Sequence, residues 1–162
     1  MGVRNKTESD ASWIRELLVR HFGSERLVSR GVLHDGLILP GLVAVGDDSP
    51  AGFLLYKIVE GECEVVAVIA DQTRIGAGRY LLKEIEKFAA AGGCKRLWLI
   101  TTNENATAIQ FYTSMGWEKV AIHKGAVREA RKLKPEIPEA ALDGTPIEDE
   151  LEFEFPLSRF DR

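Results

Sequence analysis

The most informative stretch of this 162-residue chain is residues 68–78, with the sequence Val-Ile-Ala-Asp-Gln-Thr-Arg-Ile-Gly-Ala-Gly. An apolar run leads into a short polar loop, and Gly76 and Gly78 stand where the pattern changes from strand to helix. A helix N-terminus offers unpaired backbone N–H groups, and glycines let an anion approach that backbone closely. The segment therefore predicts a strand, a loop and a helix that bind a phosphate, with Arg74 and Arg79 adding positive charge at the rim.

The segment fits neither of two common nucleotide-binding motifs. The dinucleotide fingerprint needs a third glycine at the position of Leu81, and the P-loop needs a Gly-Lys pair that the chain lacks. A tight turn without a ligand therefore stays an alternative interpretation of the two glycines.

Outward from this segment, the hydrophobic periodicity alternates between strand and helix. Upstream it predicts an edge strand at 3–5, a helix at 11–21 capped by Asp10, a short helix and a loop within 22–40, and an antiparallel meander of strands at 42–45, 52–59 and 62–70. Downstream it predicts a helix from Gly76 to Gly92-Gly93, a strand at 96–101, a helix at 105–115, and strands at 117–122 and 151–157. We expect an α/β (α+β) fold with a central mixed, mostly antiparallel sheet and helices on both faces.

The composition is that of one globular domain. The residues are 45% hydrophobic and 28% charged, and a domain typically holds about 100–200 residues. The formal net charge of −4 argues against a nucleic-acid partner. Neither a signal peptide nor a membrane-spanning run is recognisable, so we expect a cytoplasmic protein with no membrane partner. Cys63 and Cys94 lie far apart in the sequence, which predicts reduced thiols and no metal site.

A second motif, N-x-x-A-I-x-F-Y-x-x-x-G-W, runs from Asn105 to Trp117. With the glycine-rich helix start, it resembles the GNAT superfamily of acyl-CoA-dependent N-acetyltransferases. The resemblance covers residues 42–122, and Thr73 and Ala70 depart from the family pattern at its R/Q and Pro-like positions. It implies one acetyltransferase domain over 1–162, with N-terminal helices (1–41), an acetyl-CoA-binding core (42–122), and an insert with the last strand (123–162).

The resemblance also implies a set of residues that contact acetyl-CoA. The strand end at Val68, Ile69 and Ala70 would part from its neighbour and pair with pantetheine. Backbone amides at the start of the following helix would hold the pyrophosphate, and these belong to Arg74, Ile75, Gly76, Ala77 and Gly78, with Arg79 beside them. Asn105 would touch the cofactor near the start of its own helix, although a plain helix cap is an equally good interpretation.

Catalytic roles follow for a tyrosine and a glutamate. Tyr112 matches the family tyrosine beside the thioester sulfur, where a protonated phenol can donate to the departing thiolate. A lysine-type amine has a pKa of about 10.4, so it needs a base before it can attack. Glu62 and Glu64 share one strand face, and either can be that base or an ordinary surface residue. Packing alone remains an alternative for Tyr112, and His21, His34 and His123 are interpreted as structural.

The expected activity is direct transfer of an acetyl group from acetyl-CoA to the primary amine of a small molecule or peptide. No acyl-enzyme is expected, because both cysteines lie outside the predicted sulfur site. A non-catalytic CoA-binding or regulatory module is the alternative.

A basic cluster from Lys124 to Lys134 precedes an acidic run at 136–154. Four interpretations of what the cluster contacts stay open: the CoA 3′-phosphate, a second subunit, the acidic run or solvent. A homodimer through an exposed strand at 151–157 is also left open.

Overall fold

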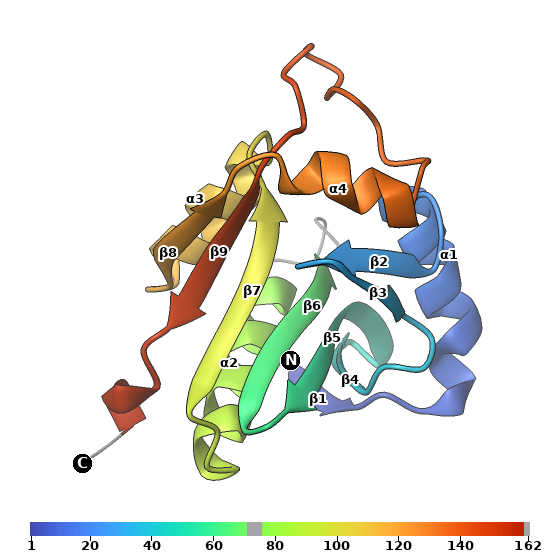
Figure 1. The fold of residues 1–162 in the computed structure, drawn as a ribbon. Coiled ribbons are helices and arrows are strands. Elements are labelled where there is room, and N and C mark those ends of the chain that lie inside the picture. Colours follow the sequence, from blue (N-terminus) through green and yellow to red (C-terminus); the bar gives the residue numbers. More distant parts are fainter. Residues whose placement is uncertain (71–75, 161–162) are drawn as a thin grey trace.

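The computed structural model describes residues 1–70 and 76–160. Its main element is a seven-stranded sheet with one parallel pair, β6/β7, among antiparallel neighbours (Figure 1). In spatial order the strands are β1 (Gly2–Asn5), β4 (Gly41–Gly46), β5 (Ser49–Val59), β6 (Glu62–Ala70), β7 (Arg96–Thr102), β9 (Glu150–Phe155) and β8 (Glu118–His123). A separate hairpin, β2 (Arg26–Ser29) and β3 (Val32–Asp35), lies across the sheet on the face away from α2.

Helices cover both faces of the sheet, which confirms the expected fold class. The helices are α1 (Ala11–Phe22), α2 (Ala77–Ala91), α3 (Ala106–Ser114) and α4 (Ala126–Leu133), with short 3-10 turns at Glu8–Asp10 and Leu157–Phe160. On one face, Leu81 and Ile85 of α2 join the larger buried cluster, against which Phe111 of α3 also packs. On the other face, Ile14 and Leu18 of α1 form the second cluster with strand residues. Among the described helices, none is long and apolar enough to cross a membrane.

Strand β6 parts from β7 halfway along its length. It pairs with β5 from end to end, but its parallel ladder with β7 covers only Glu62–Val65 against Arg96–Leu99. A bulge lies at the same point, because Leu55 pairs with Ala67 and Tyr56 with Val65, which leaves Val66 as the extra residue. Beyond Leu99, β7 continues beside β9, so a gap in the ladder opens between β6 and β7 (Figure 1). The expected parting of this strand is therefore present.

The prediction of a short helix within 22–40 is wrong, because this segment forms the β2–β3 hairpin. Its turn residues, Arg30 and Gly31, have φ angles of 46° and 77°. Two successive left-handed residues form the tight turn that suits the twist of paired strands. An Arg-Gly pair is a weaker hairpin signal than Asn-Gly or Asp-Gly, and the sequence pattern on each side is short.

The predicted helix cap at Asp10 is also wrong. The Asp10 carboxylate makes no capping bond to α1; it accepts two hydrogen bonds from the Arg4 guanidinium at 2.8 and 2.9 Å and one from the Thr7 backbone N–H at 2.8 Å. The Arg4 hydrogen bonds lower the pKa of Asp10 to about 2 against the opposing effect of burial. Asp10 thus ties strand β1 to the start of α1.

The last strand lies inside the sheet instead of at its edge. Strand β9 pairs with β7 on one side and with β8 on the other, so it has no free edge for a second subunit. This removes the predicted basis for a homodimer through residues 151–157. The preceding segment also holds more regular structure than predicted, since α4 occupies the stretch just before Pro135.

Candidate active site

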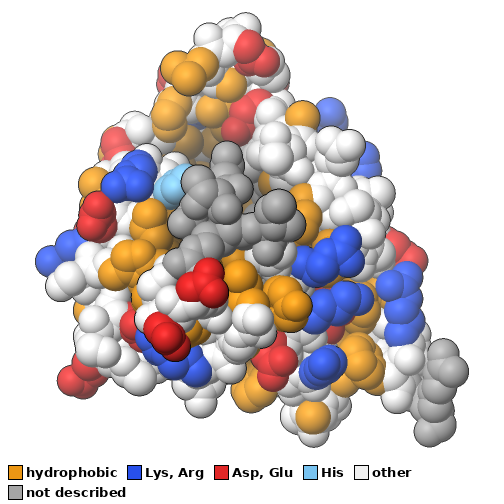
Figure 2. Space-filling view, turned by 180° about the vertical axis from the view of Figure 1, so that it is seen from behind, with side chains coloured by type: hydrophobic (Ala, Val, Ile, Leu, Met, Phe, Trp, Pro, Cys, Tyr) orange, Lys and Arg blue, Asp and Glu red, His pale blue; other side chains and the backbone are white. Residues whose placement is uncertain are grey.

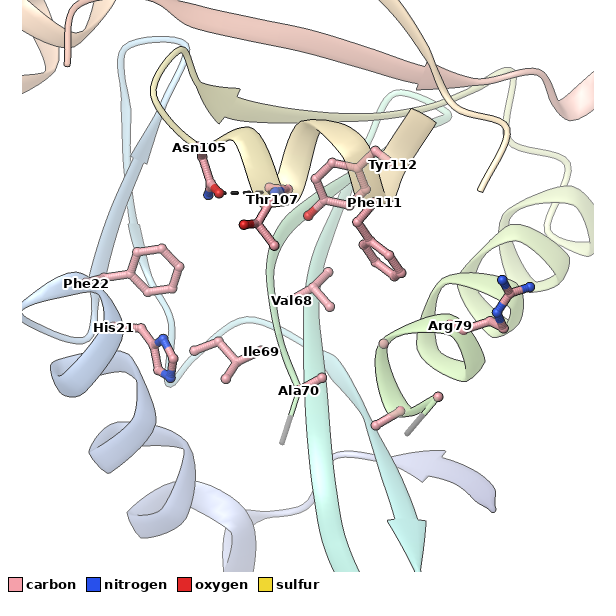
Figure 3. A pocket seen from close by; sticks show the side chains of 14 residues that line it. His21, Phe22, Val68, Ile69, Ala70, Arg79, Asn105, Thr107, Phe111 and Tyr112 are labelled. Atoms are coloured by element: carbon pink, nitrogen blue, oxygen red, sulfur yellow. Dashed lines mark hydrogen bonds between the residues drawn. The ribbon is translucent and has the colours of Figure 1, made fainter. Parts of the chain in front are cut away.

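A cavity of about 880 Å³ lies where β6 parts from β7 (Figure 3). Three segments line most of it: the end of β6, the start of α2 and one side of α3, with the C-terminal end of α1 beside them. Every predicted cofactor residue that the structure describes lines this cavity, namely Val68, Ile69, Ala70, Gly76, Ala77, Gly78, Arg79, Asn105 and Tyr112. Arg74 and Ile75 lie outside the described residues. His21, Phe22 and Thr107 also line the cavity, and the sequence patterns did not single them out as lining residues.

The two glycines at the start of α2 are needed for different reasons. Gly76 has a φ of 97°, a left-handed conformation that side chains rarely adopt. Gly78 has no such angle, but a Cβ there would lie 3.3 Å from Cζ of Phe111, so glycine lets α2 pack closely against α3. The prediction attributed both glycines to the approach of an anion, whereas the second one is needed for helix packing in any case.

Basic side chains follow α2 away from the cavity. Arg79, Lys83 and Lys87 are exposed and recur every four positions, so they share one stripe of the helix. Figure 2 shows the face that carries α2, where Lys and Arg side chains gather on one side. The positive end of the helix dipole and Arg79 together make the cavity rim favourable for an anion.

Tyr112 is placed with its ring in the core and its hydroxyl toward the cavity (Figure 3). The ring centroid lies 5.6 Å from that of Phe111 and 6.0 Å from those of Trp117 and Phe153. The hydroxyl has no hydrogen-bond partner among the described residues. Burial raises the pKa of Tyr112 to about 12, so the phenol keeps its proton at neutral pH. The side chain therefore packs and also presents a free donor.

Asn105 caps α3 and borders the cavity at the same time. Its Oδ1 accepts a hydrogen bond from the backbone N–H of Ala108 at 3.1 Å, which confirms the predicted cap. The side chain lies at the cavity wall, near Thr107 (Figure 3). Capping uses one of its polar atoms, so the role as a cap and a contact to a ligand are compatible.

The two candidate glutamates of β6 have different surroundings. Glu64 is 7% exposed, and its Oε2 accepts a hydrogen bond from Ser29 Oγ at 2.6 Å. Burial raises the pKa of Glu64, while Ser29 and the charge of Lys57 act in the opposite direction. The Glu62 side chain is 39% exposed and lies 3.5 Å from the Arg96 guanidinium. Glu64 is thus the buried and perturbed carboxyl group, and Glu62 is a solvated ion-pair partner.

Ser29 in turn contacts His34 across the β2–β3 hairpin, with 2.8 Å between Oγ and Nε2. All three groups of the chain Glu64–Ser29–His34 are buried. Burial and the nearby charge of Lys57 lower the pKa of His34 to about 4, so His34 is neutral at pH 7. Ser29 was not predicted, and His34 was interpreted as structural, because the hairpin that carries both was itself missed.

Two further buried side chains, those of Glu150 and Lys134, anchor the β2–β3 hairpin to the rest of the chain. Glu150 is 3% exposed and accepts from the backbone N–H and the guanidinium of Arg30, at 3.2 and 3.4 Å. Lys134 donates from Nζ to the carbonyl oxygens of Phe22 and Arg26, at 2.7 and 2.6 Å. The hairpin is therefore held at its tip by β9 and at its base by the residue that follows α4.

The basic cluster is partly paired with the acidic run, which was one of the four interpretations left open. Lys124 lies 3.5 Å from Asp149, and Arg131 lies 3.8 Å from Glu139. Arg131 also donates to three backbone carbonyls of the same loop, between residues 137 and 147. These contacts show that much of the cluster organises the 135–149 loop.

Three features around one cavity define the acetyltransferase class of fold. They are a parallel strand that parts from its neighbour, a glycine-rich helix start, and a helix that carries aromatic side chains. The model of the Acetyltransferase (GNAT) family matches residues 13–117, and the chain belongs to this family. It is 36% identical over 142 residues to YdhI of Bacillus subtilis, covering 86% of this chain and 88% of that protein. It is 33% identical over 126 residues to the [ribosomal protein bS18]-alanine N-acetyltransferase of Salmonella typhimurium, covering 76% of this chain and 84% of that protein.

The fold is shared with solved acetyltransferases. One of them is a Bacillus subtilis acetyltransferase in complex with CoA, with a TM-score of 0.65 and 14% sequence identity, covering 95% of this chain and 98% of that one. At this level of identity the likeness concerns the fold alone.

Proposed function

We propose that this protein transfers an acetyl group from acetyl-CoA directly to a primary amine within a ternary complex. The observation that carries the proposal is the meeting of three features in one cavity. These are the half of β6 that has no ladder with β7, the N-terminus of α2 and the hydroxyl of Tyr112. Membership of the GNAT family supports the same conclusion.

The residues present fit acetyl-CoA. Beyond Val65, the edge of β6 that faces β7 has no ladder partner in the described sheet, so amides of an extended ligand can pair with it. The backbone at Gly76, Ala77 and Gly78 begins a helix, where N–H groups favour a pyrophosphate. Arg79 adds positive charge at the rim. The bound cofactor supplies an acyl group activated as a thioester.

Glu64 is the proposed proton acceptor. When the amine nitrogen bonds to the acetyl carbon, the carbon–sulfur bond breaks and the nitrogen loses a proton, which Glu64 takes up directly or through water. A raised pKa suits this task, because a base with a pKa closer to neutrality holds a proton more readily. Glu64 stands one residue before Val65, the last residue of β6 to pair with β7, and its side chain lines a second cavity beneath the β2–β3 hairpin instead of the cavity at the gap.

Tyr112 is the proposed partner of the departing sulfur. A thiol has a pKa of about 8.5, well below the value of about 12 for Tyr112. Full proton transfer from the phenol to the thiolate is therefore uphill, and the hydroxyl acts by donating a hydrogen bond to the developing negative charge. Burial of the ring fixes the direction of that bond.

An acyl-enzyme intermediate on Cys63 or Cys94 has little support. Cys63 is fully buried in the larger core cluster, and burial raises its pKa to about 12, so it is a poor nucleophile at neutral pH. Neither Cys63 nor Cys94 lines the cavity at the gap. Direct attack by the amine is thus the simpler route.

The acceptor is proposed to be a small molecule or a peptide with a free primary amine. Glu150 and Glu152 lie near enough to Glu64 that their negative charges oppose its ionisation and raise its pKa. Such a group of carboxylates favours an ammonium ion over an anion. The similarity to an enzyme named for the alanine of ribosomal protein bS18 adds peptide N-termini to the amines worth testing.

Calorimetry with acetyl-CoA and CoA, followed by release of free CoA thiol with a panel of alkylamines, diamines and short peptides, tests the proposal. We expect binding of both cofactors and amine-dependent thiol release. Binding without release from any amine would favour the non-catalytic CoA-binding module. Absence of binding would rule out both functions.

A further inference from the structure

We propose that Ser29 and His34 of the β2–β3 hairpin are positioning residues that hold Glu64 as the proton acceptor of the transfer. The inference rests on the proposed function and adds two residues to its machinery. It starts from an unbroken chain of two hydrogen bonds, His34 to Ser29 at 2.8 Å and Ser29 to Glu64 at 2.6 Å.

The contacts divide the two oxygens of Glu64 between two tasks. Oε2 is held by Ser29, whereas Oε1 has no hydrogen-bond partner among the described residues. The Glu64 side chain also lines a cavity of about 320 Å³, beside Lys57 and Trp98. A carboxylate fixed through one oxygen and open at the other is arranged to receive a proton without losing its orientation.

The chemistry of the three groups sets the direction of both hydrogen bonds. An ionised carboxylate only accepts, so the single proton of Ser29 points to Glu64. The Ser29 oxygen then accepts from Nε2–H of His34, so a neutral His34 carries its proton on that nitrogen. Burial and Lys57 keep His34 neutral at pH 7. Because His34 does not take up a proton readily, the pair orients Glu64 and does not relay its proton.

The hairpin is fixed well enough to act in this way. Its inward side carries Leu27, Ser29 and His34, which are all buried. The turn is tied to Glu150 through Arg30, and the start of β2 is tied to Lys134 through the Arg26 carbonyl. Both ends of the element that presents Ser29 are thus anchored to other parts of the chain.

Other charged groups near Glu64 also affect its pKa, in addition to the hydrogen bond from Ser29. Lys57 on β5 favours the charged carboxylate, while Glu150 and Glu152 on β9 disfavour it. Glu62 shares the same face of β6, and Arg30 lines the same cavity. None of these groups changes in a Ser29 variant, so a change in the titration of Glu64 can be assigned to the lost hydrogen bond.

The test compares wild type with Ser29→Ala, Ser29→Thr and His34→Leu, with Arg26→Ala as a control on an exposed position of the same hairpin. The rate with acetyl-CoA and the most reactive amine of the panel is measured against pH. Carbon-13 NMR of the glutamate carboxyls follows Glu64 directly. We expect Ser29→Ala to raise the pKa of Glu64, move the acidic limb of kcat/KM to higher pH and lower kcat about tenfold at pH 7. The KM for acetyl-CoA should stay unchanged. Ser29→Thr, which keeps the hydroxyl, and Arg26→Ala should resemble wild type, whereas His34→Leu, which removes the hydrogen bond to Ser29, should move the acidic limb in the same direction as Ser29→Ala by a smaller amount.

A double-variant cycle separates positioning from general damage. In a Glu64→Gln background, Ser29→Ala should have no further effect on kcat, because the group it positions is gone. An unmoved acidic limb, an unchanged Glu64 titration or a full additional loss in the double variant would each overturn the proposal. Those results, with an active wild type, would leave the proposed function intact. A wild type that acetylates no amine would instead reject the proposed function and this role with it.

Discussion

The two halves of strand β6 serve the candidate site through different parts of the chain. The half from Val66 to Ala70 has left β7 and offers its backbone to the larger cavity. The half from Glu62 to Val65 is paired on both sides and offers side chains instead, above all Glu64. The proposed binding of an extended cofactor therefore rests on main-chain geometry, while the proposed proton transfer rests on a buried group of side chains.

This division implies that the two halves respond differently to change. Replacing a side chain of the proton-transfer half should alter turnover and leave cofactor affinity in place. Altering the backbone near the half from Val66 to Ala70 should change cofactor affinity more than turnover.

Glu64→Gln should lower kcat about 100-fold while acetyl-CoA binds as before, because the amine loses its proton acceptor. Glu62→Gln is the matched control on the same strand face, and we expect less than about a twofold change. Steady-state kinetics and calorimetry measure the two quantities. If the Glu62 variant carried the larger loss, the assignment of the base would have to be reversed.

Lowering the pH should destabilise the β2–β3 hairpin more than the start of α2 and the rest of the proposed cofactor site. The lowered pKa of His34 means that the unfolded chain binds a proton more readily than the folded one, so stability is present above pH 6.5 and is lost as the pH falls toward 4. The difference between pH 7 and pH 5 is about 2 kcal/mol. Amide hydrogen exchange should rise in β2 and β3 at pH 5 more than in α2. His34→Gln should remove this pH dependence, and its persistence in that variant would exclude His34 as the cause.

Tyr112→Phe should lower kcat about tenfold and change acetyl-CoA affinity little, since only the hydroxyl is removed and the ring still packs. Below about pH 11 the tyrosine does not titrate, because its pKa is about 12. The ratio of wild-type to variant kcat should therefore be constant between pH 6 and 9. Equal activity of the two proteins would reduce Tyr112 to a packing residue.

Gly76→Ala should weaken acetyl-CoA binding a few-fold and destabilise the protein by about 1 kcal/mol, because alanine at a φ of 97° is strained. Thermal unfolding and calorimetry measure these effects. Gly2→Ala provides the control, since a Cβ there meets no other atom within 4 Å and the position has no left-handed φ. Unchanged affinity in Gly76→Ala would show that the start of α2 tolerates distortion.

The same contrast explains what the sequence could predict. The cofactor side comes from contiguous segments between residues 62 and 117, and each carries a local signal such as alternation, a glycine pair or the Asn105 cap. The proton-transfer side depends on pairs such as Ser29–Glu64 and Arg30–Glu150, which are 35 and 120 residues apart. No local pattern encodes such distant contacts, and the hairpin that makes them was predicted as helix and loop. Gly78 was correctly placed at the cavity, but no pattern in the sequence indicated that its contact with Phe111 also requires a glycine.

The position of β9 has a consequence for how the chain is synthesised. In the described sheet, β8 reaches the other strands only through β9, which is the last strand in the sequence. Until residues 150–155 have left the ribosome, β7 and β8 each keep an open edge that another chain can join. Completion of the sheet therefore comes after the synthesis of all its other strands. A nascent chain halted before residue 150 would hold most of the cofactor side and lack the strand that anchors the hairpin through Glu150.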